Sequence, residues 1–284
     1  YGAGGTTGSG YYTKNHYPYG TIQGGTWNYV YGYGATVGGG WYSGARSSWG
    51  VTAGGWYCNG YAYDSIAGGH YNWAYSSYQT IGGGSYNYIY TSYNTVAGGH
   101  NHYVYGYAGS IGGGMYNSVY GAYGAVGGGY QNRAFATYSS VLGGYRGHAY
   151  GSYNSIGQGS SSYMYGPAHV SVVGGHNHYI YAYAGTVAGG MYGSVYGSYG
   201  TVGAGWYNHC YGTYSTIVSG YDMVVSGTGS TLGGGIDNNV YSSYSTIIGG
   251  TSSYMYVAYA TIAGGHNHYV YGYTASIGGG MYNS

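Results

Sequence analysis

The chain has 284 residues and a formal net charge of +1, with 67 Gly, 51 Tyr and only 2% charged residues. Its 2 Pro exclude a collagen triple helix, and β-branched residues at fixed intervals argue against a disordered chain. Its 4 Lys and Arg residues are too few to neutralise a nucleic-acid backbone, and no apolar run approaches the length of a membrane-spanning helix. We therefore expect neither a nucleic-acid partner nor a membrane span.

In chain order, residues 1–20 are expected to be an irregular start or a fragment of a preceding coil. Residues 21–284 are expected to be a repeat domain that stops inside a repeat. From residue 21 the motif [Ser/Thr]-[Val/Ile]-x-Gly-Gly recurs about 18 times, and we number its first residue slot 1. The interval is fifteen residues, except that it is one shorter near residues 56–64 and one longer near residues 165–170.

Two apolar positions recur in each repeat. Slot 2 is mostly Val or Ile, and slot 10 is Val, Ile, Met, Ala or Cys. A constant short period is typical of a solenoid, in which each coil stacks on the last, and the high Gly content disfavours helices. We therefore predict an all-β, parallel β-solenoid of about 18 coils, spaced about 4.8 Å apart. Its core columns include Ile81, Val96, Ile111 and Val126 in slot 2, and Val104 and Val119 in slot 10.

Slot 8 is often Asn, and it shares strand parity with the apolar slot 10. Its amides are therefore predicted to point to the same face as the core and to hydrogen-bond from coil to coil as a ladder. The members of this ladder are Asn72, Asn87, Asn117 and Asn132.

Slot 11 has the opposite parity and is aromatic in nearly every repeat, which predicts an outward stripe. Such a stripe suits adhesion and sugar stacking. It would equally well be buried between chains, or stabilise the sheet by stacking alone. The candidate stripe comprises Tyr75, Tyr90, Tyr105, Tyr120, Tyr150, Tyr165, Tyr181 and Tyr196.

The repeat pattern Thr-Val-x-Gly-Gly-x-x-Asn-x-[Ala/Val]-x-Gly resembles the head repeats of trimeric autotransporter adhesins, and similar repeats occur in some phage tail-fibre proteins. The resemblance extends from about residue 21 to the end of the chain. It implies a left-handed parallel β-roll, three chains around a common axis and an extracellular role in attachment. The sequence departs from the family at slot 11, where the family usually has small residues and this chain has aromatic ones.

Three His-Asn-His triplets are the main candidates for metal chemistry. In an extended strand, both rings of a triplet would share one side, and three chains could gather them around a metal. The alternative is that the second His of each triplet replaces Asn in the slot 8 ladder. We favour the alternative and expect neither a metal nor a cofactor. The residues concerned are His100, His102, His176, His178, His266 and His268.

Other reactive groups are sparse. Cys58 and Cys210 are about ten coils apart in sequence, too far to form a disulfide within one chain. The three acids, Asp64, Asp222 and Asp237, are expected to lie far apart. Because no carboxylate pair or Ser-His-Asp grouping can be assembled, we do not expect an enzyme.

Slots 1 and 3 flank the apolar slot 2 and are mostly small, as in Thr95 and Ala97, which favours a flat contact face between chains. We predict a non-enzymatic structural protein, extracellular or at the cell surface, that self-associates as a trimer or a filament. Its Tyr surface would attach to a carbohydrate or a host-surface ligand. The alternatives are a phage or viral tail-fibre shaft and, less favoured because only slot 1 supplies a Thr row, an ice-binding solenoid.

Overall fold

Residues 4–284 are described by a computed structural model, and they form an all-β, parallel β-solenoid of about 18 turns in which no residue is helical. This confirms the fold class predicted from the fifteen-residue period. The chain divides into two compact units, Tyr1–Gly143 and Gly144–Ser284. Among the described residues there is no helix of the length and apolarity that a membrane span requires.

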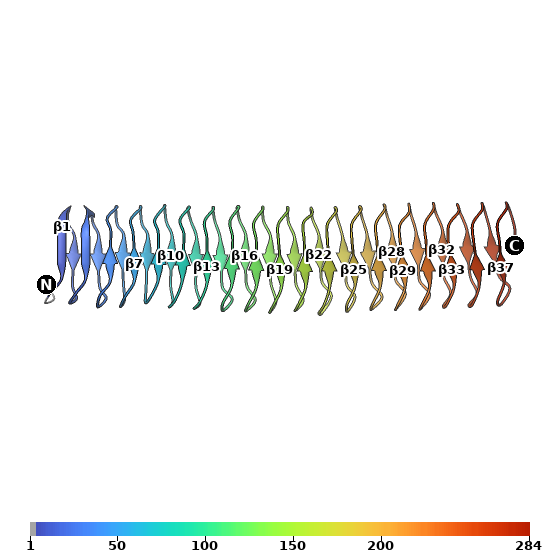
Figure 1. The fold of residues 1–284 in the computed structure, drawn as a ribbon, viewed down its shortest axis with the longest axis horizontal. Helices are drawn as coiled ribbons and strands as arrows, with labels where there is room; N and C mark the ends of the chain where they lie inside the picture. Colours follow the sequence, from blue (N-terminus) through green and yellow to red (C-terminus); the bar gives the residue numbers. More distant parts are fainter. Residues whose placement is uncertain (1–3) are drawn as a thin grey trace. The chain divides into compact units, whose positions relative to one another are not determined.

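Each coil contains two short strands and two corners, and within each unit the strands of successive coils stack in two columns (Figure 1). Slots 1 and 2 form the first column, and slots 9 and 10 form the second. In the first unit, the first column consists of β1 (Thr6–Tyr11), β3 (Thr21–Thr26), β5 (Thr36–Val37), β7 (Val51–Thr52), β9 (Ser65–Ile66), β11 (Thr80–Ile81), β13 (Thr95–Val96), β15 (Ser110–Ile111), β17 (Ala125–Val126) and β19 (Ser140–Val141). The second column of this unit consists of β2 (Lys14–Asn15), β4 (Tyr29–Val30), β6 (Gly44–Ala45), β8 (Asn59–Gly60), β10 (Trp73–Ala74), β12 (Tyr88–Ile89), β14 (Tyr103–Val104), β16 (Ser118–Val119) and β18 (Arg133–Ala134).

The second unit repeats this arrangement. Its first column consists of β21 (Ser155–Ile156), β23 (Ser171–Val172), β25 (Thr186–Val187), β27 (Thr201–Val202), β29 (Thr216–Ile217), β31 (Thr231–Leu232), β33 (Thr246–Ile247), β35 (Thr261–Ile262) and β37 (Ser276–Ile277). Its second column consists of β20 (His148–Ala149), β22 (Tyr163–Met164), β24 (Tyr179–Ile180), β26 (Ser194–Val195), β28 (His209–Cys210), β30 (Val224–Val225), β32 (Asn239–Val240), β34 (Tyr254–Met255) and β36 (Tyr269–Val270).

Strands of neighbouring coils pair in parallel, slot against slot, at a spacing of fifteen residues. The spacing changes in two places. Val51 pairs with Ser65, fourteen residues on, and Ser155 pairs with Ser171, sixteen residues on. In both places the corner between the second strand and the next first strand absorbs the change, so the strand columns continue in register.

The first described coil begins before residue 21. Strand β1 pairs with β3, and β2 pairs with β4, at the same fifteen-residue spacing as later coils. Residues 6–15 therefore contribute strands to both columns of the first unit.

The interior of each unit is filled by the side chains of slots 2 and 10. In a strand, successive side chains point to opposite faces, so one member of each two-residue strand points inward. Burying a Val or Ile side chain contributes roughly 1.5–3 kcal/mol of transfer free energy. The predicted core residues are each 1% exposed or less: Ile81, Val96, Ile111, Val126, Val104 and Val119.

The corner after the first strand requires glycine at slot 5. Gly84 has a φ of +86°, and a Cβ added there would lie 2.1 Å from the carbonyl oxygen of Gly99 in the next coil. Slot 7 is also left-handed although it is often Tyr, as at Tyr86 with a φ of 58°. Slot 14, in the other corner, repeats this conformation at Tyr93 with a φ of 66°. This coil thus places three residues with positive φ at its corners, in slots 5, 7 and 14.

Candidate functional site: the stacked aromatic columns

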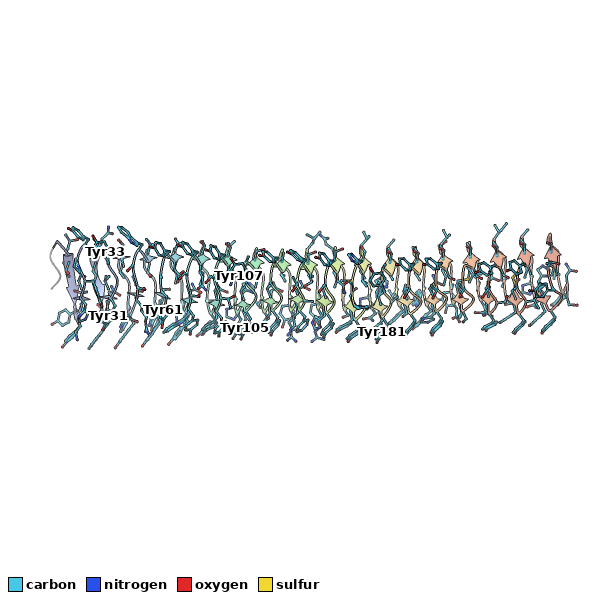
Figure 2. The ribbon with its side chains drawn as sticks, turned by 90° about the horizontal axis from the view of Figure 1, so that it is seen from below. Tyr31, Tyr33, Tyr61, Tyr105, Tyr107 and Tyr181 are labelled. Carbon is cyan, nitrogen blue, oxygen red and sulfur yellow. The ribbon has the colours of Figure 1, made fainter. Side chains whose placement is uncertain are left out.

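The slot 11 residues form a stack of exposed aromatic rings, which we call the aromatic stripe. Slot 10 points into the core, so strand alternation turns slot 11 outward. Ring centroids lie 4.5 Å apart between Tyr90 and Tyr105 and 5.2 Å apart between Tyr105 and Tyr120, with interplanar angles of 2° and 7°. These distances match the separation of about 4.8 Å between paired strands, so strand pairing sets the stacking. Figure 2 shows Tyr31 and Tyr105, both members of the stripe, along the same edge of the first unit.

The stripe is present in the second unit as well. Ring centroids are 4.8 Å apart for Tyr150 and Tyr165, 5.0 Å for Tyr165 and Tyr181, and 5.1 Å for Tyr181 and Tyr196. Burial raises the pKa of the Tyr165 and Tyr196 hydroxyls, and the neighbouring Tyr hydroxyls raise it further. These two residues therefore present neutral hydroxyls at ordinary pH.

The stripe residues proposed from the sequence are all at least half-buried by their neighbours on two sides, yet accessible. Seven of them have an exposed fraction between 37% and 46%, namely Tyr75, Tyr105, Tyr120, Tyr150, Tyr165, Tyr181 and Tyr196. Tyr90 has an intermediate exposure. A ligand could therefore contact ring edges and hydroxyls, whereas the ring faces are largely covered by the coils above and below.

Two further aromatic columns occupy the corners, and the sequence interpretation did not identify them. At slot 7, the rings of Tyr42, Tyr57 and Tyr71 stack at successive distances of 4.8 Å. At slot 14, Tyr63 and Tyr78 stack at 4.9 Å. Their signal in the sequence is the recurrence of Tyr at these two slots. It was missed because left-handed positions are normally taken by Gly or Asn.

The slot 8 amides bridge neighbouring coils through the backbone. Asn117 Oδ1 accepts a 2.9 Å hydrogen bond from the N–H of Asn132, and its Nδ2 donates to the carbonyls of Gly113 and Gly129 at 2.8 and 3.0 Å. Each amide thus bonds to the corner backbone of its own coil and of the next coil. The fully buried members are Asn72, Asn87, Asn117 and Asn132.

His102 occupies the same slot and accepts the equivalent backbone hydrogen bond at Nδ1, whereas its buried Nε2 has no hydrogen-bond partner. The N–H of Asn117 donates to His102 Nδ1 at 3.1 Å, and the N–H of His102 donates to Asn87 Oδ1 at 3.2 Å. The ring is therefore neutral, with its proton on Nε2. Burial lowers the pKa of His102 to about 4. His178 and His268 accept a backbone N–H at Nδ1 in the same way.

The first His of each triplet lies at the surface. Asn101 has a φ of 58°, so the chain is not an extended strand there and the two rings of the triplet do not share one side. His100 Nδ1 is 2.8 Å from Ser85 Oγ, and His176 and His266 occupy the same slot in the second unit. Within residues 4–284, no three His, Cys, Asp or Glu residues gather into a group that could hold a metal ion.

The two cysteines are unpaired thiols inside the solenoid. Both are 0% exposed, and burial raises the pKa of Cys58 and raises that of Cys210 to about 11. Buried, protonated thiols of this kind are poor nucleophiles.

The acids are distributed differently from the expectation. Asp222 and Asp237 occupy slot 7 of neighbouring coils, because Tyr221 pairs with Ile236. They are therefore close in the fold, and the prediction that all three acids lie far apart is wrong for this pair. Asp64 lies in the first unit, where it is 1% exposed.

The fold and this surface define a β-solenoid repeat protein whose exterior is dominated by stacked, uncharged aromatic rings. A comparison with protein-family models gave no match, and a comparison with curated proteins gave none. The resemblance to adhesin head repeats therefore stays a prediction that depends on the repeat motif alone.

Proposed function

We propose that the chain is a non-enzymatic structural protein of an extracellular or cell-surface fibre, and that its aromatic stripe makes the attachment contacts. The observation that carries this proposal is the regular stack of exposed Tyr rings, such as Tyr90, Tyr105 and Tyr120. Tyr offers a large contact area at a small entropic cost, together with a hydroxyl for hydrogen bonds. An array with one such group per coil suits a repetitive ligand, such as a polysaccharide or another copy of the fibre.

The small-residue face supports self-association. In the first unit, slots 1 and 3 line an apolar surface groove of about 290 Å³, with Thr95, Ala97, Gly112 and Gly127 along it. A flat strand surface with short side chains admits close approach of a second copy. We propose that this face forms the contact in a homotrimer, and that a nearly uncharged exterior favours further lateral association into filaments.

The attachment role is tested with a triple variant in the stripe of the full chain. Replacing Tyr90, Tyr105 and Tyr120 by Ser removes the rings while leaving the core columns intact. We expect retention of the protein on immobilised polysaccharide or on fibres of itself to fall at least about tenfold, given that aromatic contacts are worth about 0.5–1.5 kcal/mol each. The matched control replaces the same residues by Phe, which keeps the stack. Equal retention of the Ser variant and the parent would contradict the role.

The tail-fibre alternative belongs to the same structural class and differs in the assembly that the fibre serves. Isolation of the native protein tests it directly. We expect fibres at the cell surface, and recovery with tail-containing particles would replace that role by the alternative.

Ice binding is a second candidate, favoured by one observation in the second unit. Slot 1 there includes six successive Thr residues, each of which pairs with the next, namely Thr186, Thr201, Thr216, Thr231, Thr246 and Thr261. We rank it second because slot 3 of the same face includes Val218 and Ile248, which are 52% and 59% exposed and interrupt a flat surface. Inhibition of ice recrystallisation by the full chain would reverse this ranking.

A further inference from the structure

The aromatic stripe is interrupted in the third described coil of the first unit, where slot 11 is Arg46. In the same coil slot 9 is Gly44, within β6, so this coil has no side chain on the outer face of its second strand. The ring of Tyr29, from the preceding coil, fills that space: a Cβ added to Gly44 would lie 2.2 Å from Tyr29 Cε2. Arg46 in slot 11 and Gly44 in slot 9 therefore reshape the stripe locally.

Arg46 is held in place by aromatic groups. Its Nη2 donates a 2.7 Å hydrogen bond to Tyr29 Oη, and the Tyr29 hydroxyl in turn donates to Asn59 Oδ1. Its Cζ lies 5.3 Å from the ring centroids of both Tyr29 and Trp73, and 5.8 Å from that of Tyr61. These contacts fix the guanidinium without neutralising it. Among residues 4–284, no carboxylate pairs with Arg46, and its Nε is buried without a hydrogen-bond partner.

A pocket opens beside this guanidinium. Its volume is about 530 Å³, and it is lined by Tyr29, Tyr31, Arg46 and Tyr61. Tyr31 is 44% exposed, and its ring is supported from behind by His16, stacked at 4.5 Å. The pocket thus combines a supported aromatic wall with an uncompensated positive charge.

A second cation lies close to the same wall. A smaller neighbouring pocket is lined by Lys14 together with Tyr29 and Tyr31. Lys14 and Arg46 are two of the 4 Lys and Arg residues in the whole chain. Half of the Lys and Arg residues of this nearly uncharged protein therefore lie beside the place where Gly44 hollows the stripe.

We propose that this pocket binds a carboxylate-bearing pyranose, the uronic acid unit of an acidic polysaccharide. The planar guanidinium of Arg46 matches a carboxylate with two parallel hydrogen bonds, and the exposed ring of Tyr31 offers a face for the sugar ring. A pocket of this size accommodates one or two sugar units. The proposal goes beyond the fibre role, because an unassembled chain would bind the sugar equally well.

The test uses calorimetric titration of the full chain with tri-galacturonate, with neutral tri-galactose and with acetate as separate ligands. We expect the acidic trisaccharide to bind at least about tenfold more tightly than either of the others. Neutral tri-galactose lacks the carboxylate that makes charge-assisted bidentate hydrogen bonds, and acetate lacks the sugar ring that contacts the aromatic wall. The affinity is expected to fall as salt is added. Equal affinity for the acidic and the neutral sugar would overturn the proposal, and so would equal affinity for acetate.

Variants assign the binding to this pocket. Arg46→Gln is expected to weaken tri-galacturonate binding at least about tenfold, and Tyr31→Ala to weaken the trisaccharide while leaving acetate unaffected. Arg146→Gln is the matched control, since Arg146 belongs to the second unit, where it lies 5.0 Å from the Tyr145 ring centroid. Unchanged affinity in both Arg46→Gln and Tyr31→Ala would refute the site, whichever outcome the fibre experiments have. If Arg46→Gln fails to fold, Tyr31→Ala alone tests the site, provided that its thermal unfolding transition matches that of the parent.

Discussion

At the residue scale, Asp64 is a buried carboxyl in an otherwise uncharged corner. Burial raises its pKa to about 7 from an ordinary value of 3.8, although the backbone N–H groups of Gln79 and Tyr61 donate to the carboxylate and oppose the shift. A raised acid pKa means that the folded state resists ionisation. The contribution of Asp64 to stability is therefore expected to be lost as pH rises from about 4 to about 7, whereas the lowered pKa of His102 gives an opposite contribution, which is gained as pH rises from about 4 to about 6.5.

Asp64→Asn tests this assignment, since Asn94 and Asn154 occupy the same slot in other coils. We expect the variant to be more stable than the parent above pH 7, by roughly 4 kcal/mol at most, and equally stable below pH 4. Denaturant unfolding at pH 4 and pH 8 measures the difference. The control is Asp222→Asn at an exposed position. An unaltered pH dependence in Asp64→Asn would show that the carboxyl does not titrate between these pH values.

Glycine is required at Gly84, in slot 5, but not at Gly98, in slot 4 of the next coil, and these two positions allow a matched comparison. Gly84→Ala places a Cβ 2.1 Å from the carbonyl oxygen of Gly99 at a left-handed position, whereas a Cβ at Gly98 meets nothing within 4 Å. We expect Gly84→Ala to destabilise the fold by more than about 1–2 kcal/mol, the cost of the left-handed conformation alone. Gly98→Ala should change stability by less than about 0.5 kcal/mol. Thermal unfolding of the two variants measures the difference in stability. Equal destabilisation would mean that the corner backbone shifts to accommodate the added Cβ at Gly84.

At the element scale, the corner that follows each first strand depends on slot 8. Asn117 satisfies one buried N–H and two carbonyls, so Asn117→Leu leaves three backbone groups unpaired. An unsatisfied buried group costs about 1–3 kcal/mol, and we expect a loss of at least about 2 kcal/mol in the free energy of unfolding.

Asn117→His is the informative control, because His102 already makes the equivalent Nδ1 contact. We expect this variant to retain most of the stability of the parent in the same denaturation experiment. If Leu and His are tolerated equally, the coil-to-coil hydrogen bonds do not determine the stability of the corner.

The sequence predicted the strand columns but not the corner geometry. Slots 2 and 10 are mostly aliphatic and recur at a constant period. The sequence therefore indicates which side chain of each two-residue strand points into the core. Parity arguments fail at slot 7, because a left-handed residue such as Asn101 reverses the chain direction and separates the two His of a triplet. The left-handed Tyr corners could not be predicted, since propensity assigns these conformations to Gly and Asn. In residues such as Tyr57, ring stacking against the neighbouring coils compensates the energetic cost of the left-handed backbone conformation.

At the whole-molecule scale, both compact units are built from one repeat by pairing between neighbouring coils. Every coil pairs only with its neighbours, so single-residue changes in coil length are absorbed in corners without disturbing the columns. The Arg46 pocket is also a local variation on the repeat. The fifteen-residue period does not predict it, because the pocket depends on the packing of Tyr29 over Gly44.

We propose above all that this solenoid is the repeating element of a fibre. The most direct measurement is electron cryo-microscopy of the assembled protein, with mass per length determined on the same particles. We predict fibres with a meridional layer line near 4.8 Å and a mass per length equal to three coils, one from each of three chains, per coil rise. Dispersed single chains without that layer line, at concentrations where fibres should form, would contradict the claim.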